Sequence, residues 1–200
     1  MRLLGTFLAL GAGLVFEQAQ PANREALWKQ VAATEKKGLP KTAAAKLQLI
    51  YDSALRDGRH AEAIKALAKR ITHEGAVQGN KPEEKITRLQ AELEKTPDEA
   101  KPLLQTILGH WYWQYFRANR YRFLQRTATA QPLGDDFTTW DLPRLYREID
   151  LHFTNALADG RLKTIPTTDF ADLLTKPTLP EKYRPTLYDF IAHEALGFYS

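Results

Sequence analysis

The sequence of 200 residues contains no cysteine and only two serines, Ser53 and Ser200. The lack of cysteine excludes disulfides, thiolate metal sites, cysteine nucleophiles and lipoprotein-type lipid attachment. Neither serine lies in a G-x-S-x-G motif, which excludes the nucleophile turn of serine hydrolases. Beyond residue 20 there is also no G-x-x-x-x-G-K or G-x-G-x-x-G loop to hold a phosphate group. These absences remove the commonest enzyme classes, and we expect a non-catalytic protein with no cofactor.

The histidines and acidic residues form no recognisable metal motif. The string "HEALG" at 193–197 begins like the H-E-x-x-H helix of zinc proteases, but Gly197 stands where the second histidine is required. Asp135 and Asp136 could ligate a cation, although two adjacent loop carboxylates more often cap a turn or bind arginine. We predict no metal site and ordinary hydrogen-bonded histidines. The five histidines are scattered along the chain: His60, His73, His110, His152 and His193.

No segment alternates apolar and polar residues as a β-strand would, and neither charge sign dominates. The net charge is +4, with 26% charged and 44% hydrophobic residues. Basic and acidic residues are interleaved, so the overall charge does not favour a nucleic-acid partner. We predict an all-α globular protein that does not bind nucleic acid.

The first residues, "MRLLGTFLALGAGLVFEQAQP", contain Arg2 and then an uncharged apolar run from Leu3 to Phe16. This layout is typical of a secretory signal peptide, and the run is short for a membrane-spanning helix. We interpret residues 1–20 as a signal peptide, cleaved somewhere over 13–19. The protein is then exported to the periplasm, the cell surface or the medium. The alternative is a buried or membrane-anchored N-terminal helix.

Helix signals dominate residues 21–127. Apolar residues recur with a period of about 3.6 residues, and the intervening turns carry glycine or proline. Thr96 is expected to cap the last of these helices. Short turns between consecutive helices predict antiparallel helical hairpins, in a tetratricopeptide-like α-solenoid without a strict repeat register. The expected helices cover 23–37, 41–57, 60–74, 82–95 and 98–126.

The helical pattern is interrupted by loop-forming residues over residues 128–200, which we interpret as a helical extension with long loops. Asp141 is expected to cap a helix that has Pro143 in its first turn. A short helix is expected near 168–175, and a final apolar helix begins near Leu187. This helix runs up to Ser200 without a terminating signal, so we expect the chain to continue into further domains.

The string "HWYWQYFRANRYRFLQRT" at 110–127 holds seven aromatic rings and four arginines. On a helix the rings surround the axis instead of lining one side, which indicates a central helix covered by its neighbours. Each buried ring removes about 150–250 Å² from water, so core packing is the favoured interpretation. The alternatives are an aromatic groove for sugar or peptide and a stacking platform for single-stranded nucleic acid.

The arginines of this stretch have no acidic neighbours, because no Asp or Glu occurs between Glu99 and Asp135. We expect them to pair with the acids that follow or to stack on aromatic rings. We further hypothesise a buried polar network, with a structural role, that joins the loop to the last helices. Its candidate members are Asn119, Arg120, Arg126, Asp141, Arg184 and Tyr188.

Four segments resemble the N-terminal region of large bacterial alpha-2-macroglobulin-family proteins: "LWKQVAATEKKGLPKTAAAKLQLIYDSAL", "NRYRFLQRT", "TTWDLPRLYREIDLHFTNAL" and "YRPTLYDFIAHEAL". The resemblance covers roughly residues 24–200. It implies an exported endopeptidase inhibitor in which a helical, tetratricopeptide-like region precedes macroglobulin β-sandwich domains. The bait region, the thioester and the sandwich domains of the family have no counterpart in this sequence. No functional residue therefore carries over.

The resemblance leads us to expect a non-catalytic scaffold or docking module of an exported alpha-2-macroglobulin-like protein involved in broad peptidase inhibition. Its expected partners are the downstream macroglobulin-type domains of the same polypeptide and, beyond them, peptidases or envelope proteins. The alternative is a stand-alone secreted module that binds peptides or glycans. Its groove would lie between the 41–74 hairpin and the aromatic helix.

Overall fold

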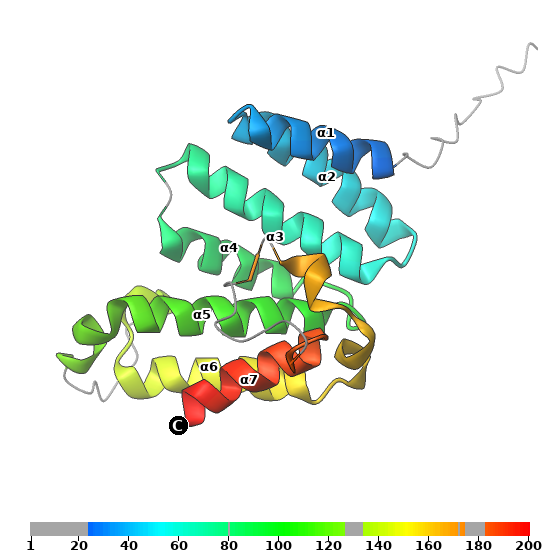
Figure 1. Ribbon diagram of the computed structural model, residues 1–200. Coiled ribbons are helices and arrows are strands. Elements are labelled where there is room, and N and C mark those ends of the chain that lie inside the picture. The colour runs from blue at the N-terminus through cyan, green and yellow to red at the C-terminus, as the bar shows by residue number, and fades with distance from the viewer. Residues whose placement is uncertain (1–23, 80, 127–133, 172, 175–182) are drawn as a thin grey trace, which may run out of the picture.

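The computed structural model describes residues 24–79, 81–126, 134–171, 173–174 and 183–200 (Figure 1). These ranges contain no β-strand, which confirms the all-α prediction; the expected signal peptide lies outside them. The α-helices are α1 (Arg24–Lys36), α2 (Pro40–Arg56), α3 (His60–Val77), α4 (Pro82–Leu93), α5 (Lys101–Leu124), α6 (Leu142–Leu157) and α7 (Leu187–Tyr199). Three short 3₁₀ helices are η1 (Phe137–Thr139), η2 (Gly160–Thr164) and η3 (Thr167–Phe170).

Proline and glycine set the helix boundaries in the first half of the chain. Pro40 and Pro82 occupy the first turns of α2 and α4, where a missing N–H group costs nothing. Gly38 and Gly58 follow α1 and α2 with φ values of 65° and 66°, in the left-handed region that glycine adopts without strain. Because these turns are short, each helix runs antiparallel to the one before it (Figure 1).

Side-chain caps begin the last two α-helices, α6 and α7. As predicted, Asp141 caps α6: its carboxylate accepts a hydrogen bond of 2.9 Å from the N–H of Arg144. Thr186 and Asp189 form a reciprocal capping box at the start of α7. Both arrangements satisfy backbone donors that the first helical turn leaves free.

Two predicted boundaries are wrong. Helix α3 continues through Gly75, which is buried there, because packing in the folded protein outweighs the low helix propensity of glycine. Helix α5 begins only at Lys101, with Pro102 in its first turn. Thr96 does not cap α5; its hydroxyl donates instead to the carbonyl of Glu92 at 2.7 Å.

The helices pack in chain order, and α5 lies in the middle of the second half (Figure 1). Helix α5 contacts α3, α4, α6 and α7. Its approach to α6 is close: a β-carbon on Gly109 would lie 2.8 Å from the ring of Phe153. One large core extends from α3 to α7, and a small one joins the first three helices. The small core consists of Val31, Leu47, Ile50 and Ala66.

The segment before η3 is fixed to the start of α7 by a short antiparallel bridge. The N–H of Thr167 donates to the carbonyl of Pro185, and the N–H of Leu187 donates to the carbonyl of Ile165, both at 2.9 Å. The expected short helix near 168–175 is the shorter η3, followed by a turn. These bonds place the 160–174 segment beside the last helix.

Candidate functional site

The aromatic stretch of α5 is largely core, as predicted. Trp111, Tyr112, Tyr115, Phe116 and Phe123 are each at most 6% exposed. Trp113 is half-buried and lies 5.5 Å, between ring centroids, from both Phe116 and Phe198. Tyr121 is the exception, with 77% of its surface exposed. These five rings are therefore mainly part of the core, although Trp111 and Tyr115 also line a pocket beside α4.

Tyr112 joins α5 to the loop before α6 and to α6 itself. Its ring meets Phe137 edge-on at 5.0 Å and stacks on His152 at 5.3 Å and on Trp140 at 6.5 Å. Burial raises the pKa of the Tyr112 hydroxyl above its usual value. The hydroxyl therefore stays protonated over the physiological pH range and makes a poor general base.

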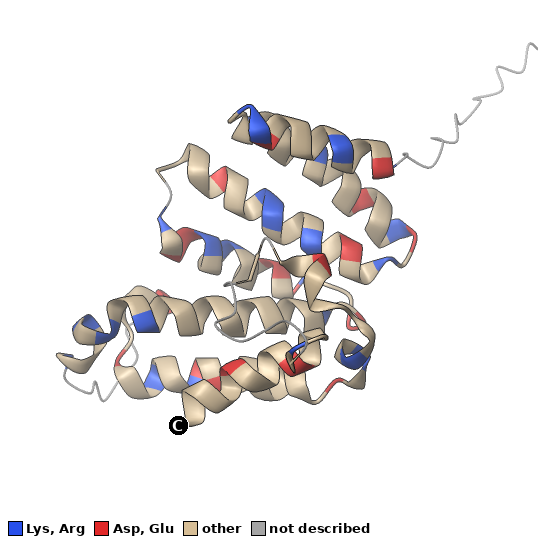
Figure 2. Cartoon of the chain, viewed as in Figure 1, with Lys and Arg blue, Asp and Glu red and all other residues tan. Residues whose placement is uncertain are grey.

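The arginines of this stretch do not pair with carboxylates as expected, but Arg126, just after α5, does lie over a ring: its guanidinium is 4.9 Å from the ring centre of Phe123. Arg126 donates to the carbonyl oxygens of Trp140, at 2.6 Å, and Thr138, at 2.5 Å. Arg122 donates to the same Thr138 carbonyl at 3.1 Å. The guanidinium groups thus bind carbonyl oxygens that the short turn η1 exposes, where we had expected carboxylates. Figure 2 shows how few acidic residues lie along α5.

Two members of the hypothesised polar network, Arg126 and Asp141, lie at the same turn without bonding each other. Arg126 binds the carbonyl of Trp140, and the neighbouring Asp141 caps α6, so both residues hold the same turn. Asn119 lies at a kink in α5, with φ −117° and ψ 18°, and its amide donates to the carbonyl of Tyr115 at 2.9 Å. Arg120, next to it, is exposed. A charged group without a carboxylate partner is costly to bury, which explains why Arg120 points to solvent.

The other two members lie at the opposite end of the α5–α7 layer (Figure 1). Arg184 is 7% exposed, and its guanidinium lies 5.7 Å from the ring of Phe190. Tyr188 is half-buried beneath the amine of Lys163, 4.7 Å from its ring centre. The hypothesis of one buried network is therefore wrong for Arg120, and the remaining residues occupy separate positions.

Two buried histidines that sequence reasoning treated as ordinary connect α5 to its neighbours. His110, 2% exposed, places its Nδ1 atom 3.0 Å from a carboxylate oxygen of Glu194 in α7. Gln114 donates to that same oxygen at 3.0 Å. Burial acts to raise the pKa of Glu194, but the bonds from His110 and Gln114 and the positive charges nearby outweigh it and leave the pKa lowered.

His152 makes the matching connection between α5 and α6. It is 1% exposed, its Nδ1 atom bonds the side-chain oxygen of Gln105, and its Nε2 atom lies 3.3 Å from Glu148. The hydrogen bond from His152 is the main cause that lowers the pKa of Glu148. A sequence signal existed here: Gln105 and His110 are polar positions inside an apolar helix, and Glu148 and His152 are one helical turn apart.

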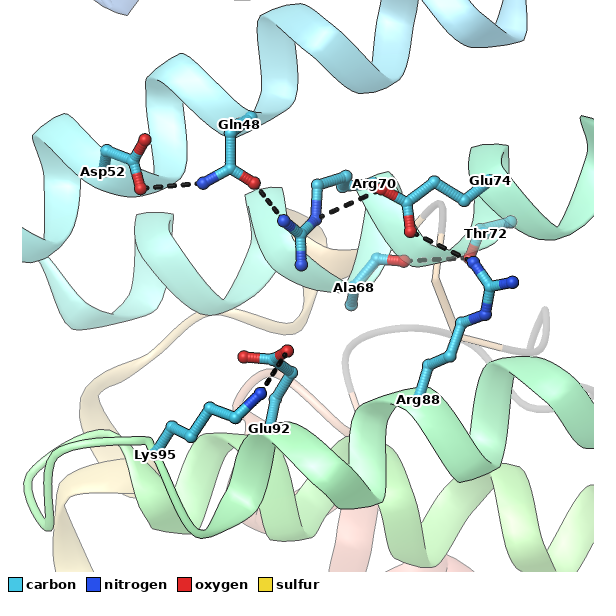
Figure 3. Close-up of polar contacts among 9 residues, drawn as sticks. All are labelled: Gln48, Asp52, Ala68, Arg70, Thr72, Glu74, Arg88, Glu92 and Lys95. Atoms are coloured by element: carbon cyan, nitrogen blue, oxygen red, sulfur yellow. Dashed lines mark hydrogen bonds and ion pairs between the residues drawn. The ribbon is translucent and has the colours of Figure 1, made fainter.

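A row of charged and amide side chains crosses α2, α3 and α4 (Figure 3). We name it the α2–α4 polar row. Arg70 of α3 bonds Gln48 of α2, and its Nε atom lies 3.7 Å from Glu74. Glu74 is in turn 3.2 Å from Arg88 of α4. Arg70, Glu74 and Arg88 thus alternate in charge along the row, and Asp52 extends it beyond the neutral Gln48 at 2.8 Å.

Two pockets lie beside these features. The larger, of about 730 Å³, is formed by the α2–α3 turn, by Trp28 of α1 and by Asp169 and Phe170 of η3. The smaller, of about 280 Å³, lies between α4, α5 and residues 173–174. We name it the Lys85 pocket, after the one lysine among the described residues that line it. Its apolar walls include Ile86 and Trp111.

Among the described residues, no group of three or more histidine and acidic side chains is placed to hold a metal ion. No helix in those same ranges is long and apolar enough to cross a membrane. No family model, curated protein or solved structure matches the chain.

Proposed function

We propose that the chain is a non-catalytic scaffold or docking module, a tetratricopeptide-like solenoid at the N-terminal side of an exported alpha-2-macroglobulin-like protein. The supporting observation is that the side chains best suited to chemistry or stacking are buried against structural partners: five rings of α5, His110 and His152. In this proposal the whole protein inhibits peptidases broadly. The helical module positions the trapping domains and traps nothing itself.

The docking surface in this proposal lies on α6 and α7. Leu151, Leu196 and Tyr199 are 49%, 66% and 59% exposed, respectively. The hydroxyl of Tyr199 bonds Asp150, so the end of α7 lies beside this part of α6. Exposed apolar side chains on neighbouring elements favour a protein contact. The proposed occupants are macroglobulin-type domains of the same polypeptide, and peptidases or envelope proteins are further candidates.

The docking proposal is tested by reading the open reading frame beyond Ser200 and co-expressing any β-rich domains it encodes with this chain. We expect the domains to bind, and Leu196→Glu to weaken binding at least about tenfold, because a charge is placed in an apolar contact. Leu39→Glu is the matched control, because Leu39 is also exposed (46%) but lies before α2. Absence of β-rich domains, or equal effects of the two variants, would contradict the proposal.

Export is tested by fusing residues 1–30 to an alkaline phosphatase that lacks its own leader, since this enzyme is active only outside the cytoplasm. We expect the fusion to be active. Arg2→Glu should lower the activity, because the positive charge before the apolar run is part of the signal. An inactive fusion contradicts export.

One observation favours the second candidate, a module that binds peptides or glycans. The pocket of about 730 Å³ combines the rings of Trp28 and Phe170 with the charges of Arg59, Glu62 and Lys65. Its second wall is η3, not the aromatic helix as the sequence suggested. Binding in a glycan or peptide array that Trp28→Ala abolishes would support this candidate. Failure of every probe, or binding unaffected by Trp28→Ala, would reject it.

A further inference from the structure

Lys85 differs from the other described lysines in its surroundings. It is half-buried in the wall of the pocket between α4 and α5, and its amine lies 4.7 Å from the ring centre of Trp111. No carboxylate among the described residues forms an ion pair with it, whereas Lys69, for example, lies 3.0 Å from Glu35. The positive charge of Lys85 is therefore supported by the Trp111 ring face and little else.

The neutral form of the Lys85 amine is favoured more than the neutral form of an exposed lysine amine. The face of Trp111 attracts an ammonium group, but burial removes the water that would solvate it. Burial is the cause that lowers the pKa of Lys85 below its usual value. A neutral amine carries a free electron pair, and lysines in such environments are the ones that proteins use as nucleophiles.

The pocket restricts what can reach the amine. Its volume of about 280 Å³ lies just below the range of about 300–1,000 Å³ that holds drug-sized ligands. The walls are mainly apolar, with Ile86, Trp111 and Leu174, and the amides of Gln114 and Asn119 border it. There is room for a small apolar molecule with one polar atom, and the described residues of the wall include no second lysine or arginine.

We propose that Lys85 and its pocket form a capture site for small aldehydes. The electron pair of the neutral amine attacks the carbonyl carbon, a C–N bond forms, and the carbonyl oxygen takes up a proton. The resulting carbinolamine loses water, and the nitrogen loses its last proton, to leave an imine. No oxidant or reductant is consumed. This activity is independent of the scaffold role proposed above.

The chain offers a matched control in Lys163. Its amine lies over the ring of Tyr188 at the same distance, 4.7 Å, but the residue is exposed. The two lysines share the aromatic contact and differ in burial. The test incubates the wild-type chain with propanal, reduces the imines with cyanoborohydride, and measures the modification of each lysine by peptide mass spectrometry from pH 6.5 to 10.5.

At pH 7.5 we expect Lys85 to be modified at least about threefold faster than Lys163, with the ratio falling towards pH 10.5 as both amines become neutral. An aldehyde carried on a dextran chain should label Lys163 and spare Lys85, because a polymer cannot enter a pocket of about 280 Å³. The proposal is overturned if Lys85 reacts no faster than Lys163 at pH 7.5. A ratio that does not change with pH also overturns it, since access alone would then explain the labelling.

Discussion

The first three helices and the last three are stabilised in different ways. The buried residues of the small α1–α3 core include no aromatic ring, although Trp28 and Tyr51 pack against its edge, and alanines such as Ala43, Ala54 and Ala63 allow the helices to approach closely. Ion pairs and amides supplement it: Arg24 bonds Glu62 at 2.9 Å, and the α2–α4 polar row crosses the outer surface (Figure 3). Pairs of this kind contribute little each, typically up to about 1 kcal/mol.

The α5–α7 region instead buries rings and two histidine–carboxylate pairs. Phe153, Tyr112 and their neighbours remove much more apolar area from water per residue than alanines do. The comparison teaches that the two ends of one helical stack need not be equally stable. We therefore expect α1 and α2 to unfold locally before α5 does.

The largest effect is expected from Phe153→Ala. The ring is fully buried between α5 and α6, so its removal should lower the free energy of unfolding by about 3–5 kcal/mol. Tyr121→Ala, which removes an exposed ring from the same region, should change it by less than about 0.5 kcal/mol. Urea denaturation followed by circular dichroism measures both. Similar costs for the two variants would show that burial does not distinguish these rings.

Gly109→Ala is expected to cost about 1–3 kcal/mol, because the new methyl group would lie 2.8 Å from the Phe153 ring in a packed interface. Gly75→Ala in α3 is the control, since nothing lies within 4 Å of its added β-carbon. That variant should be neutral or more stable by up to about 1 kcal/mol, because alanine favours a helix. Thermal unfolding of the two variants measures both effects. An equal loss of stability in Gly109→Ala and Gly75→Ala would refute the close α5–α6 contact.

Glu194→Gln should lower the free energy of unfolding at pH 7 by about 1–2 kcal/mol, because it weakens the buried bond to His110. Folding lowers the pKa of Glu194, so the stabilisation is present above the ordinary glutamate value of 4.5. It is lost as the pH falls through the lower folded value. Denaturation between pH 3 and 7 should therefore show a smaller acid loss in Glu194→Gln than in wild type. An identical pH profile would exclude this linkage.

The smallest effect belongs to the α2–α4 polar row. Arg88→Met should cost about 1 kcal/mol or less, and the cost should shrink in 1 M salt because the pairs are partly exposed. Lys29→Met, which breaks an exposed pair within α1, should cost less than about 0.5 kcal/mol. Denaturation at low and high salt checks both. A cost at Arg88 above that of Phe153→Ala would reverse the comparison of the two regions.

Local signals were enough to predict most of the fold. Pro40, Pro82 and Gly58 act through their own backbone geometry, and Asp141 caps the helix that immediately follows it, so each boundary could be read without knowing the rest of the structure. Gly75 shows the limit of such signals. It is buried inside α3, and burial in the folded protein is not encoded in the propensity of a single residue.

Side-chain partners were harder to predict than helices. Burial of the α5 rings could be predicted from their distribution around the helix. The partner of His110 could not, because it is Glu194, far away in the sequence. Periodicity indicates which residues face inward without showing what they meet. The arginine contacts were missed for a related reason, since Arg126 binds backbone carbonyls that every residue possesses and that no sequence motif marks.

The central claim is that α5 is the covered centre of the molecule. Hydrogen exchange of the backbone amides, followed by mass spectrometry, tests it directly. We predict that residues 103–116 exchange slowest, at the rate of global unfolding, and that α1 exchanges faster through local opening. Exchange of 103–116 as fast as that of α1 would contradict the claim.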